Sequence, residues 1–436
     1  MLLSVGFSRG CITPKDNVSI YNLDGQSRNS KDILDDLYVN TIVLESDERL
    51  LLFISLDIIW VDYKFTKRIK DRLYSEIGIS DSNILICATH SHSTPQIAYH
   101  VNNEARPDKS YIDLIINIVC ERSIFSFNNR VSAKARYSSF STNLSVNRRK
   151  EVIDIYRLKK FSFEKKIANR PNLDGPLDDS LSILAFYSFS GHIICALINF
   201  ACHPTMNRRN SVSSDFPGQL NKILMDNFGD NFVSCFMQGF SGNVKALSIV
   251  NSKFSIKKPF KSIIELLFDP IKFKKDMDIT EIQNYSKSLF NKINWDFEWK
   301  NINPKFSSNN ILLNVNTSQL STGSYNNDVC TETTCIRFQR IDISDELTIV
   351  AVNGEVFTEY AIWIREALNA HGINVMPVGC SGGMIGYIPD KLSIKNGGYE
   401  VDRALYEFGR DEKFSCNIER DFKNAIMQLF DEFNLS

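Results

Sequence analysis

Short apolar runs enriched in β-branched and aromatic residues recur along the chain and predict β-strands. They cover 40–44, 50–60, 83–88, 181–189, 192–201, 232–237, 335–341, 347–352 and 373–378. Between several of them, apolar residues recur with the 3.6-residue period of an amphipathic helix, at 64–77, 111–125, 217–228, 356–370 and 418–433. Polar turns at Ser188–His192 and Asp342–Glu346 predict antiparallel hairpins. The pattern therefore predicts an α/β fold of mixed β-sheets flanked by helices.

Segment 251–305 departs from this alternation because it interleaves lysines with aromatic residues. The residues are Lys253, Phe254, Lys257, Lys258, Phe260, Lys261, Phe268, Lys272, Phe273, Lys274, Lys275, Trp295, Phe297 and Trp299. A lid or surface-docking insertion is one interpretation, since cationic and aromatic side chains together suit an amphipathic substrate or a membrane interface. A helical excursion that packs its aromatics onto the body is the interpretation we favour, because most aromatic side chains serve as core.

Charge and hydropathy exclude some classes of protein. The 436 residues include 50 Lys and Arg against 51 Asp and Glu, so the chain lacks the basic excess of a nucleic-acid-binding protein. The most apolar run, 193–201, is far shorter than the roughly 20 residues of a membrane-spanning helix, although peripheral membrane contact stays open. The N-terminus lacks the pattern of an export signal, so we expect a cytoplasmic protein.

Three apolar runs are each followed by a side chain that binds metals. His90 and His92 follow the run 83–88, His203 follows 192–201, and Glu355 follows 347–352. The period of two puts both imidazoles of the His-x-His pair on one side of a strand, at the carboxyl end, where α/β folds bind ligands. Hydrolytic zinc sites use three such ligands and a water. Glu355 at a helix start would also interact with the helix dipole, so that alternative stays open. No Cys-x-x-Cys pair offers a thiolate site instead.

Further motifs appear in order along nearly the whole chain, from residue 10 to residue 400. They are Gly10-Cys-Ile-Thr-Pro14, Ala88-Thr-His-Ser-His-Ser-Thr-Pro95, Asn147-Arg148, Phe200-Ala-Cys-His-Pro-Thr205, Ser213-Ser-Asp215, Met237-Gln-Gly-Phe-Ser-Gly-Asn243, Gly354-Glu355, Gly386-Tyr-Ile-Pro389 and Gly398-Tyr-Glu400. With these motifs the chain resembles the catalytic domain of the neutral/alkaline (non-lysosomal) ceramidase family, which are zinc-dependent amidases.

The resemblance implies one zinc ion per chain and a role for each matching residue. The implied zinc ligands are His90, His203, Glu355 and Tyr387. The implied catalytic residues around the metal-bound water and the scissile amide are His92, Arg148 and Tyr399. Asp215 has two interpretations: its carboxylate orients an imidazole, or the segment Ser213-Ser-Asp-Phe-Pro-Gly218 is a helix N-cap with Pro217 in the first turn. Ligands spread from His90 to Tyr387 must meet at one site, which favours a single domain over 1–436.

The chain departs from the family in ways that concern the substrate. Ceramidases carry Gly-Asp-x-Ser-Pro-Asn where this chain has Gly242-Asn-Val-Lys-Ala-Leu247, so Lys245 replaces the family serine. The chain ends at Ser436, and we expect no C-terminal immunoglobulin-like domain. We therefore expect a zinc-dependent amidohydrolase that cleaves the linear amide of a small N-acyl metabolite, derived from a lipid or an amino sugar. The alternatives are a zinc esterase or deacylase and a non-catalytic ligand-binding relative. The oligomeric state is left open.

Overall fold

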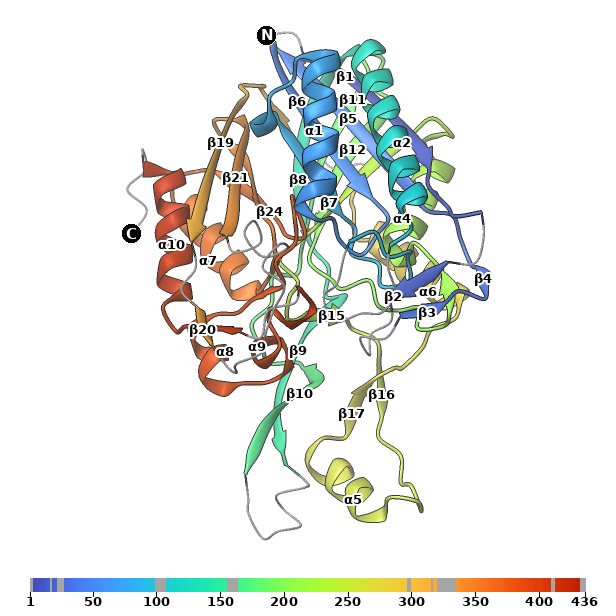
Figure 1. The fold of residues 1–436 in the computed structure, drawn as a ribbon, viewed down its shortest axis with the longest axis vertical. Coiled ribbons are helices and arrows are strands. Elements are labelled where there is room, and N and C mark those ends of the chain that lie inside the picture. The colour runs from blue at the N-terminus through green and yellow to red at the C-terminus, as the bar shows by residue number, and fades with distance from the viewer. Residues whose placement is uncertain are drawn as a thin grey trace.

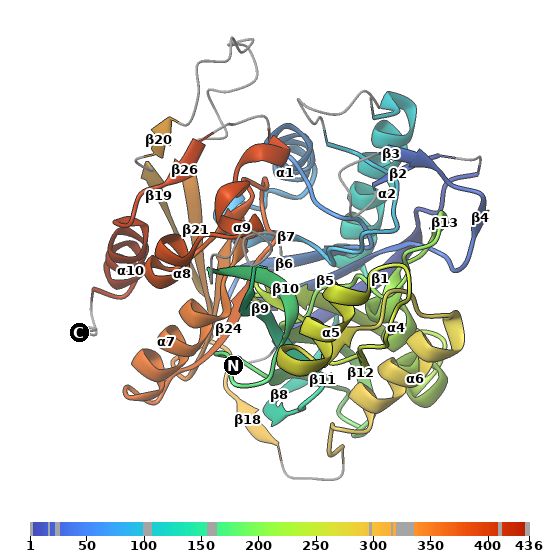
Figure 2. The same cartoon turned by 90° about the horizontal axis from the view of Figure 1, so that it is seen from below.

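The computed structural model describes residues 3–15, 18–21, 27–98, 107–154, 164–295, 299–314, 317–319, 335–408 and 412–431. Two β-sheets pack face to face, and helices cover their outer faces (Figures 1 and 2). This arrangement confirms the α/β fold with mixed sheets flanked by helices. No helix in these ranges is long and apolar enough to cross a membrane.

The larger sheet contains nine strands of mixed direction. Its order is β14 (Val233–Gln238), β12 (Ile193–Phe200), β11 (Ser180–Tyr187), β8 (Val131–Ser141), β1 (Leu3–Cys11), β5 (Tyr38–Ser46), β6 (Arg49–Leu56) and β7 (Ile84–Ala88), with β18 (Lys300–Ile302) paired to β8. The end pairs β12–β14 and β6–β7 are parallel, and the pairs between them are antiparallel.

The smaller sheet has the order β19 (Ser307–Asn314), β21 (Cys335–Ser344), β22 (Leu347–Val352) and β24 (Asn374–Val378). Its inner face and that of the large sheet share one apolar core. Helices α1 (Tyr63–Ile77) and α2 (Lys109–Asn128) cover one part of the large sheet's outer face, and α4 (Asp215–Phe228) and α6 (Ile279–Phe290) cover another. Helices α7 (Thr358–Asn369) and α10 (Ile418–Leu429) cover the small sheet.

The large sheet curls until its two ends approach each other and the small sheet. The Ser55 hydroxyl of β6 donates to the Phe236 carbonyl of β14 over 2.7 Å. The amide N–H of Gly379, just after β24, donates to the carbonyl of Gln238 at the end of β14. Parallel strands β7, β12, β14, β22 and β24 therefore finish at one end of the molecule, where the chemistry expected from the sequence is gathered.

Short elements surround this end of the two sheets. The strand groups are β10 (Lys165–Asn172) with β9 (Ser145–Ile153) and β15 (Val244–Ala246), β23 (Glu355–Val356) with β25 (Tyr387–Ile388), β16 (Ile249–Asn251) with β17 (Ile271–Phe273), β4 (Asp32–Ile33) with β13 (Ser211–Val212), β2 (Ser19–Tyr21) with β3 (Ser27–Asn29), and β20 (Thr317–Gln319) with β26 (Glu412–Phe414). The remaining helices are α5 (Pro259–Phe268), α8 (Lys391–Asn396), α9 (Tyr399–Asp402) and the 3₁₀ turns Asp81–Asn83 and Tyr406–Phe408.

All nine expected strands and five expected helices are present, as are both hairpins. The expected strand 50–60 is too long, because β6 ends at Leu56 and the next residues turn to support the site. Sequence periodicity missed β1, which contains Gly6 and Gly10. A Cβ at Gly6 would lie 1.8 Å from the Ser126 carbonyl oxygen, so the glycine lets α2 pack directly on the strand.

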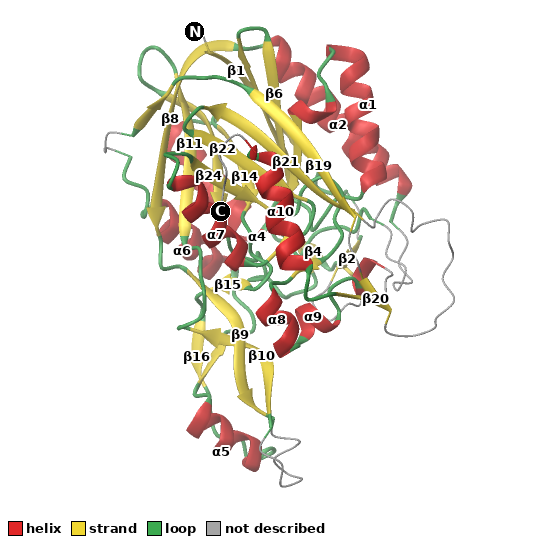
Figure 3. Ribbon diagram, turned by 90° about the vertical axis from the view of Figure 1, so that its left-hand side faces the viewer, coloured by secondary structure: helices red, strands yellow, loops and turns green. Residues whose placement is uncertain are grey.

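The aromatic insertion divides into two parts. Trp295 and Trp299 stack with ring centroids 5.3 Å apart and join the core beneath α6, as expected. Phe254 and Phe268 are 56% and 59% exposed, so the expectation that all the aromatics pack on the body is wrong for them. Helix α5 and the β16–β17 pair instead project from the body beside the β9–β10 hairpin (Figure 3). Phe297 lies outside the described residues.

Candidate functional site

His90 is held in a defined orientation by the segment that follows β6. Its backbone has the left-handed φ of 70°, and its amide N–H donates to the Ile58 carbonyl. Its ring Nδ1 donates to the Ile59 carbonyl over 2.7 Å, which leaves Nε2 unprotonated and directed away. Strand β7 ends at Ala88, so the expectation that strand periodicity aligns His90 and His92 is wrong. The turn at His90 brings the rings together, with centroids 4.8 Å apart.

His203 and Glu355 meet His90 from two other strand ends. The His203 Nδ1 donates to the Ser241 carbonyl over 2.8 Å, and its Nε2 lies 2.9 Å from Glu355 Oε2. The same carboxylate oxygen lies 3.3 Å from His90 Nε2. Helix α7 begins only at Thr358, so the Glu355 carboxylate contacts the imidazoles and not the helix end. The Nε2 atoms of both imidazoles thus converge on one carboxylate oxygen of Glu355.

The spacing of these donor atoms fits a metal ion. Zinc binds nitrogen and oxygen ligands at about 2.0–2.1 Å in a tetrahedron, which places neighbouring donors about 3.3 Å apart. The His90–Glu355 separation of 3.3 Å matches this value, and the His203–Glu355 separation of 2.9 Å is somewhat shorter. His92 Nε2 lies 3.4 Å from His90 Nε2, and the three histidines form the one potential metal cluster among the described His, Cys, Asp and Glu residues. The Nε2 atom of His92 is thus about as close to His90 Nε2 as the carboxylate of Glu355 is.

Burial sets the protonation states that a metal requires. Burial lowers the pKa of His203 to about 3 and, with the help of Arg148, keeps its ring neutral at pH 7. Burial and the neighbouring imidazoles likewise hold the pKa of His92 well below its usual range. Burial opposes ionisation of Glu355, but contact with His90 and His203 outweighs it and holds the carboxyl pKa well below normal. Neutral imidazoles and an ionised carboxylate are the metal-binding forms.

The structure brings the other expected site residues to the same place. Tyr387 pairs in register with Glu355 across β23 and β25. Arg148 Nη2 donates to the Tyr387 hydroxyl over 3.2 Å and to the Gly242 carbonyl over 2.8 Å. Tyr399, 47% exposed, stands with its ring centroid 6.0 Å from that of Tyr387. Their roles as ligands and catalytic groups stay predictions.

From the sequence, no role was assigned to two charged residues of the site, Glu400 and Arg149. Glu400, 3% exposed, lies 3.0 Å from Arg148 Nε and 2.8 Å from Arg149 Nη1. It therefore holds two adjacent guanidiniums at once. The signal was present in the Asn147-Arg-Arg and Gly398-Tyr-Glu400 segments, but residues at least 251 positions apart in sequence give no indication that they pair.

Asp215 contacts no imidazole in the described part of the chain. Its Oδ2 accepts the amide N–H groups of Met206 and Asn207, and its Oδ1 accepts that of Phe216. Ser214, not Asp215, occupies the N-cap position of α4. The imidazole-orienting interpretation is thus wrong, whereas the N-cap expected within Ser213–Gly218, with Pro217 in the first turn of the helix, is present. Asp215 in addition ties the loop after His203 to the start of the helix.

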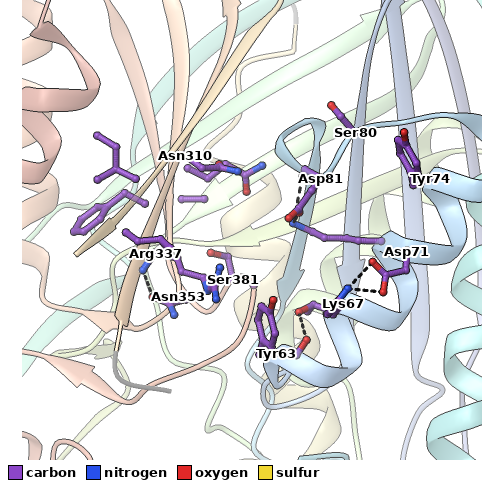
Figure 4. Close-up of a pocket in the computed structure, with 18 residues that line it drawn as sticks. Tyr63, Lys67, Asp71, Tyr74, Ser80, Asp81, Asn310, Arg337, Asn353 and Ser381 are labelled. Carbon is purple, nitrogen blue, oxygen red and sulfur yellow. Dashed lines mark hydrogen bonds and ion pairs between the residues drawn. The ribbon is translucent and has the colours of Figure 1, made fainter. Parts of the chain in front are cut away.

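A cavity of about 220 Å³ opens beside the imidazoles. Its lining includes Trp60, His92, Arg148, Asn169, Thr205, Arg208, Lys245, Glu355, Tyr387, Tyr399 and Phe408. A larger cavity, of about 460 Å³, lies between α1 and the small sheet, where Figure 4 shows Tyr63, Lys67 and Arg337 around it. The described residues that line this second cavity include no histidine, so the smaller cavity is the candidate site.

Comparisons with known proteins agree with this architecture. Neutral ceramidase from Pseudomonas aeruginosa superposes with a TM-score of 0.70 at 15% identity, over 100% of this chain and 76% of that one. A ceramidase complexed with C2 gives a TM-score of 0.69 at 14% identity with the same coverage. No protein-family model and no curated sequence matches. The resemblance inferred from the motifs is confirmed for the fold: the chain has the fold of neutral ceramidase.

Proposed function

We propose that the protein is a zinc-dependent amidohydrolase that cleaves the linear amide of a small N-acyl compound with an activated water. The observation that carries the proposal is the convergence of His90 Nε2 and His203 Nε2 on one oxygen of Glu355, within 2.9–3.3 Å. The carbonyls that accept from both Nδ1 atoms fix the ring tautomers in the metal-binding form. The names of the two superposed ceramidases favour an amide as the bond that is cleaved.

His90, His203 and Glu355 would hold the zinc ion, with the Tyr387 hydroxyl as the fourth protein group. A bound zinc supplies a Lewis acid for the amide carbonyl and lowers the pKa of a water to about 7. An ion at this site would also relieve the close approach of His92 and His90, whose Nε2 atoms are 3.4 Å apart.

The remaining polar residues of the cavity would stabilise charge on the substrate. Arg148 is fixed by Glu400 and Tyr387, so its guanidinium can donate to the oxyanion of the tetrahedral intermediate without reorganisation. Tyr399 stands at the cavity wall and donates its hydroxyl hydrogen to the same oxygen. His92 lines the cavity, where its neutral ring would accept the proton that the attacking water loses and pass it to the leaving nitrogen.

Elemental analysis of the purified protein tests the proposal, together with assays on a panel of N-acyl amides and matching esters. We expect about one zinc per chain, and we expect His203→Ala to lose both metal and hydrolysis. His192→Ala is the matched control, because His192 is an exposed histidine in the β11–β12 turn. Wild-type protein without stoichiometric metal would refute the zinc site, and metal-bound protein that cleaves only the esters would refute the amidase.

A further inference from the structure

The cavity beside the imidazoles carries an excess of positive charge. Arg148, Arg208 and Lys245 line it, whereas Glu355 is the one carboxylate among its lining residues in the described ranges. The charge of Arg148 is balanced by Glu400, whose Oε1 lies 3.0 Å from Arg148 Nε. Arg208 and Lys245 form no ion pair with any described carboxylate, and only the more distant charges of Asp276 and Asp215 attract them.

Lys245 is the more unusual of the two cations. It is 6% exposed, and its ammonium lies over the Phe273 ring, with Nζ 5.1 Å from the ring centroid. A buried ammonium without a counter-ion is unfavourable, and an anion in the cavity would remove that penalty.

A hydroxyl in the same cavity also lacks a partner. Thr205 is 3% exposed, and its Oγ1 makes no hydrogen bond within the described part of the chain. The backbone of His203 forms a β-bridge with Lys245, so Thr205 and Lys245 flank the histidine from two segments. A donor hydroxyl beside two cations is the arrangement that binds carboxylate or phosphate oxygens.

We propose that the substrate carries an anionic oxygen group, which Lys245, Arg208 and Thr205 bind while its amide lies at the imidazoles. This inference rests on the proposed hydrolase and names its substrate class, an N-acyl compound with a carboxylate or a phosphate. The replacement of the family serine by Lys245 thereby determines specificity.

A matched substrate series tests the anion requirement. N-acyl glycine, N-acyl ethanolamine phosphate and neutral N-acyl ethanolamine share one acyl chain, and the two anions differ in kind. We expect the kcat/KM of wild type for one of the two anionic compounds to exceed that for the neutral compound at least about tenfold. Lys245→Met should abolish this preference, mainly by raising KM for the anionic compound. Lys67→Met is the control, since it removes an exposed lysine. Equal rates on the neutral compound, or equal losses on all three, would overturn the inference.

Anion binding is also measurable without hydrolysis, which separates this inference from the proposed function. Chelator-treated protein is titrated with inorganic phosphate at constant ionic strength by calorimetry. We expect saturable binding that Lys245→Met weakens about tenfold or more and Lys67→Met leaves unchanged. Absence of binding, or equal binding by Lys245→Met, would refute the anion site even if the amidase is established.

A second inference concerns the projection formed by residues 253–268, which we call the α5 projection. Its exposed apolar side chains are Phe254, Ile256, Phe260, Ile263, Leu266, Leu267 and Phe268, with Ile256 88% and Leu267 69% exposed. Helix α5, which carries most of them, lies at the end of the molecule furthest from α1 and α2 (Figures 1 and 3). So large an exposed apolar patch marks an interaction surface.

The charges of the α5 projection identify the partner. Its exposed charged side chains are all lysines, namely Lys253, Lys257, Lys258 and Lys261. The acidic residue within it, Glu265, is buried and paired with Arg170 and Lys272. Exposed apolar side chains interleaved along the chain with exposed lysines suit the interface of an anionic bilayer. We infer that the α5 projection docks the protein on anionic lipid membranes.

Vesicle co-sedimentation tests the docking surface. We expect the protein to sediment with vesicles that contain about 30% anionic phospholipid and to stay in solution with neutral vesicles. Ile256→Ser combined with Leu267→Ser should abolish binding, whereas Leu114→Ser combined with Phe125→Ser, at exposed positions on α2, should not. No binding to anionic vesicles would refute the inference. Loss of a dimer in light scattering on the first pair of changes, without vesicle binding, would instead assign the surface to a second copy of the chain.

Discussion

Glu400 forms ion pairs with two arginines at the site, and its substitution tests the electrostatic reasoning. The carboxylate is 3% exposed and contacts Arg148 at 3.0 Å and Arg149 at 2.8 Å. Arg149 has further acceptors in the carbonyls of Ser393 and Gly397, whereas Arg148 depends on Gly242 and Tyr387. Glu400→Gln keeps the shape of the side chain but removes the carboxylate that forms ion pairs with both guanidiniums.

Breaking a buried ion pair by removing one partner costs about 3–5 kcal/mol, and the amide oxygen of Gln still accepts one hydrogen bond. We therefore expect the lower end, about 3 kcal/mol, as the loss in free energy of unfolding. A chain of 436 residues has an unfolding entropy of about 0.9 kcal/mol/K, from about 2.1 cal/mol/K per residue. The expected fall in melting temperature is thus about 3 °C.

Urea denaturation and calorimetry of four proteins measure the effect, namely wild type, Glu400→Gln, Arg149→Met and the double variant. Because Arg149→Met removes one of the unbalanced charges, the double variant should be less destabilised than the sum of the single variants. Glu366→Gln, an exposed glutamate on α7, should stay within about 0.5 kcal/mol of wild type. Additive losses in the cycle, or an effect of Glu400→Gln no larger than that of Glu366→Gln, would refute the reasoning.

Three further predictions concern the metal, the pH and the backbone. A chelator should lower the melting temperature of wild type but not of His203→Ala, since a metal stabilises only the state that binds it. Burial raises the pKa of Asp57 to about 7, so wild-type stability should fall as the pH rises from about 4 to 7 and then level off, and urea unfolding of Asp57→Asn should lack this slope. A Cβ at Gly242 would lie 2.3 Å from the Glu355 carbonyl, so Gly242→Ala should displace Glu355 and reduce bound zinc, as measured by elemental analysis.

Local sequence patterns predicted the elements because strand and helix periods are set by burial on one face. The apolar runs that became β7, β14 and β22 are buried along their whole length, so they were visible without alternation. Strand β10 is mostly half-exposed and polar, and it was missed for that reason. The Phe residues of the α5 projection were misjudged because composition does not show whether an apolar face finds a partner.

The candidate site likewise contains residues that the sequence predicted and contacts that it did not. His90, His203 and Glu355 were identified because each follows an apolar strand, and the motifs added Tyr387, Arg148 and Tyr399. The pairing of Glu400 with two arginines, the backbone role of Asp215 and the left-handed turn at His90 were not foreseen. Each depends on contacts between segments that are distant in the chain or on a single backbone angle, and hydrophobic periodicity reports neither.

The sequence alone determined the α/β class, most of the elements and the residue types able to hold a metal, since these follow from local periodicity and side-chain chemistry. Only the tertiary structure decided where the donors meet. The curl of the large sheet and its packing on the small one bring strand ends more than 100 residues apart to within 2.9–3.3 Å. The same packing buries Lys245 beside Arg208 and leaves the α5 projection exposed. Burial and long-range contact are properties of the folded chain, so no local pattern encodes them.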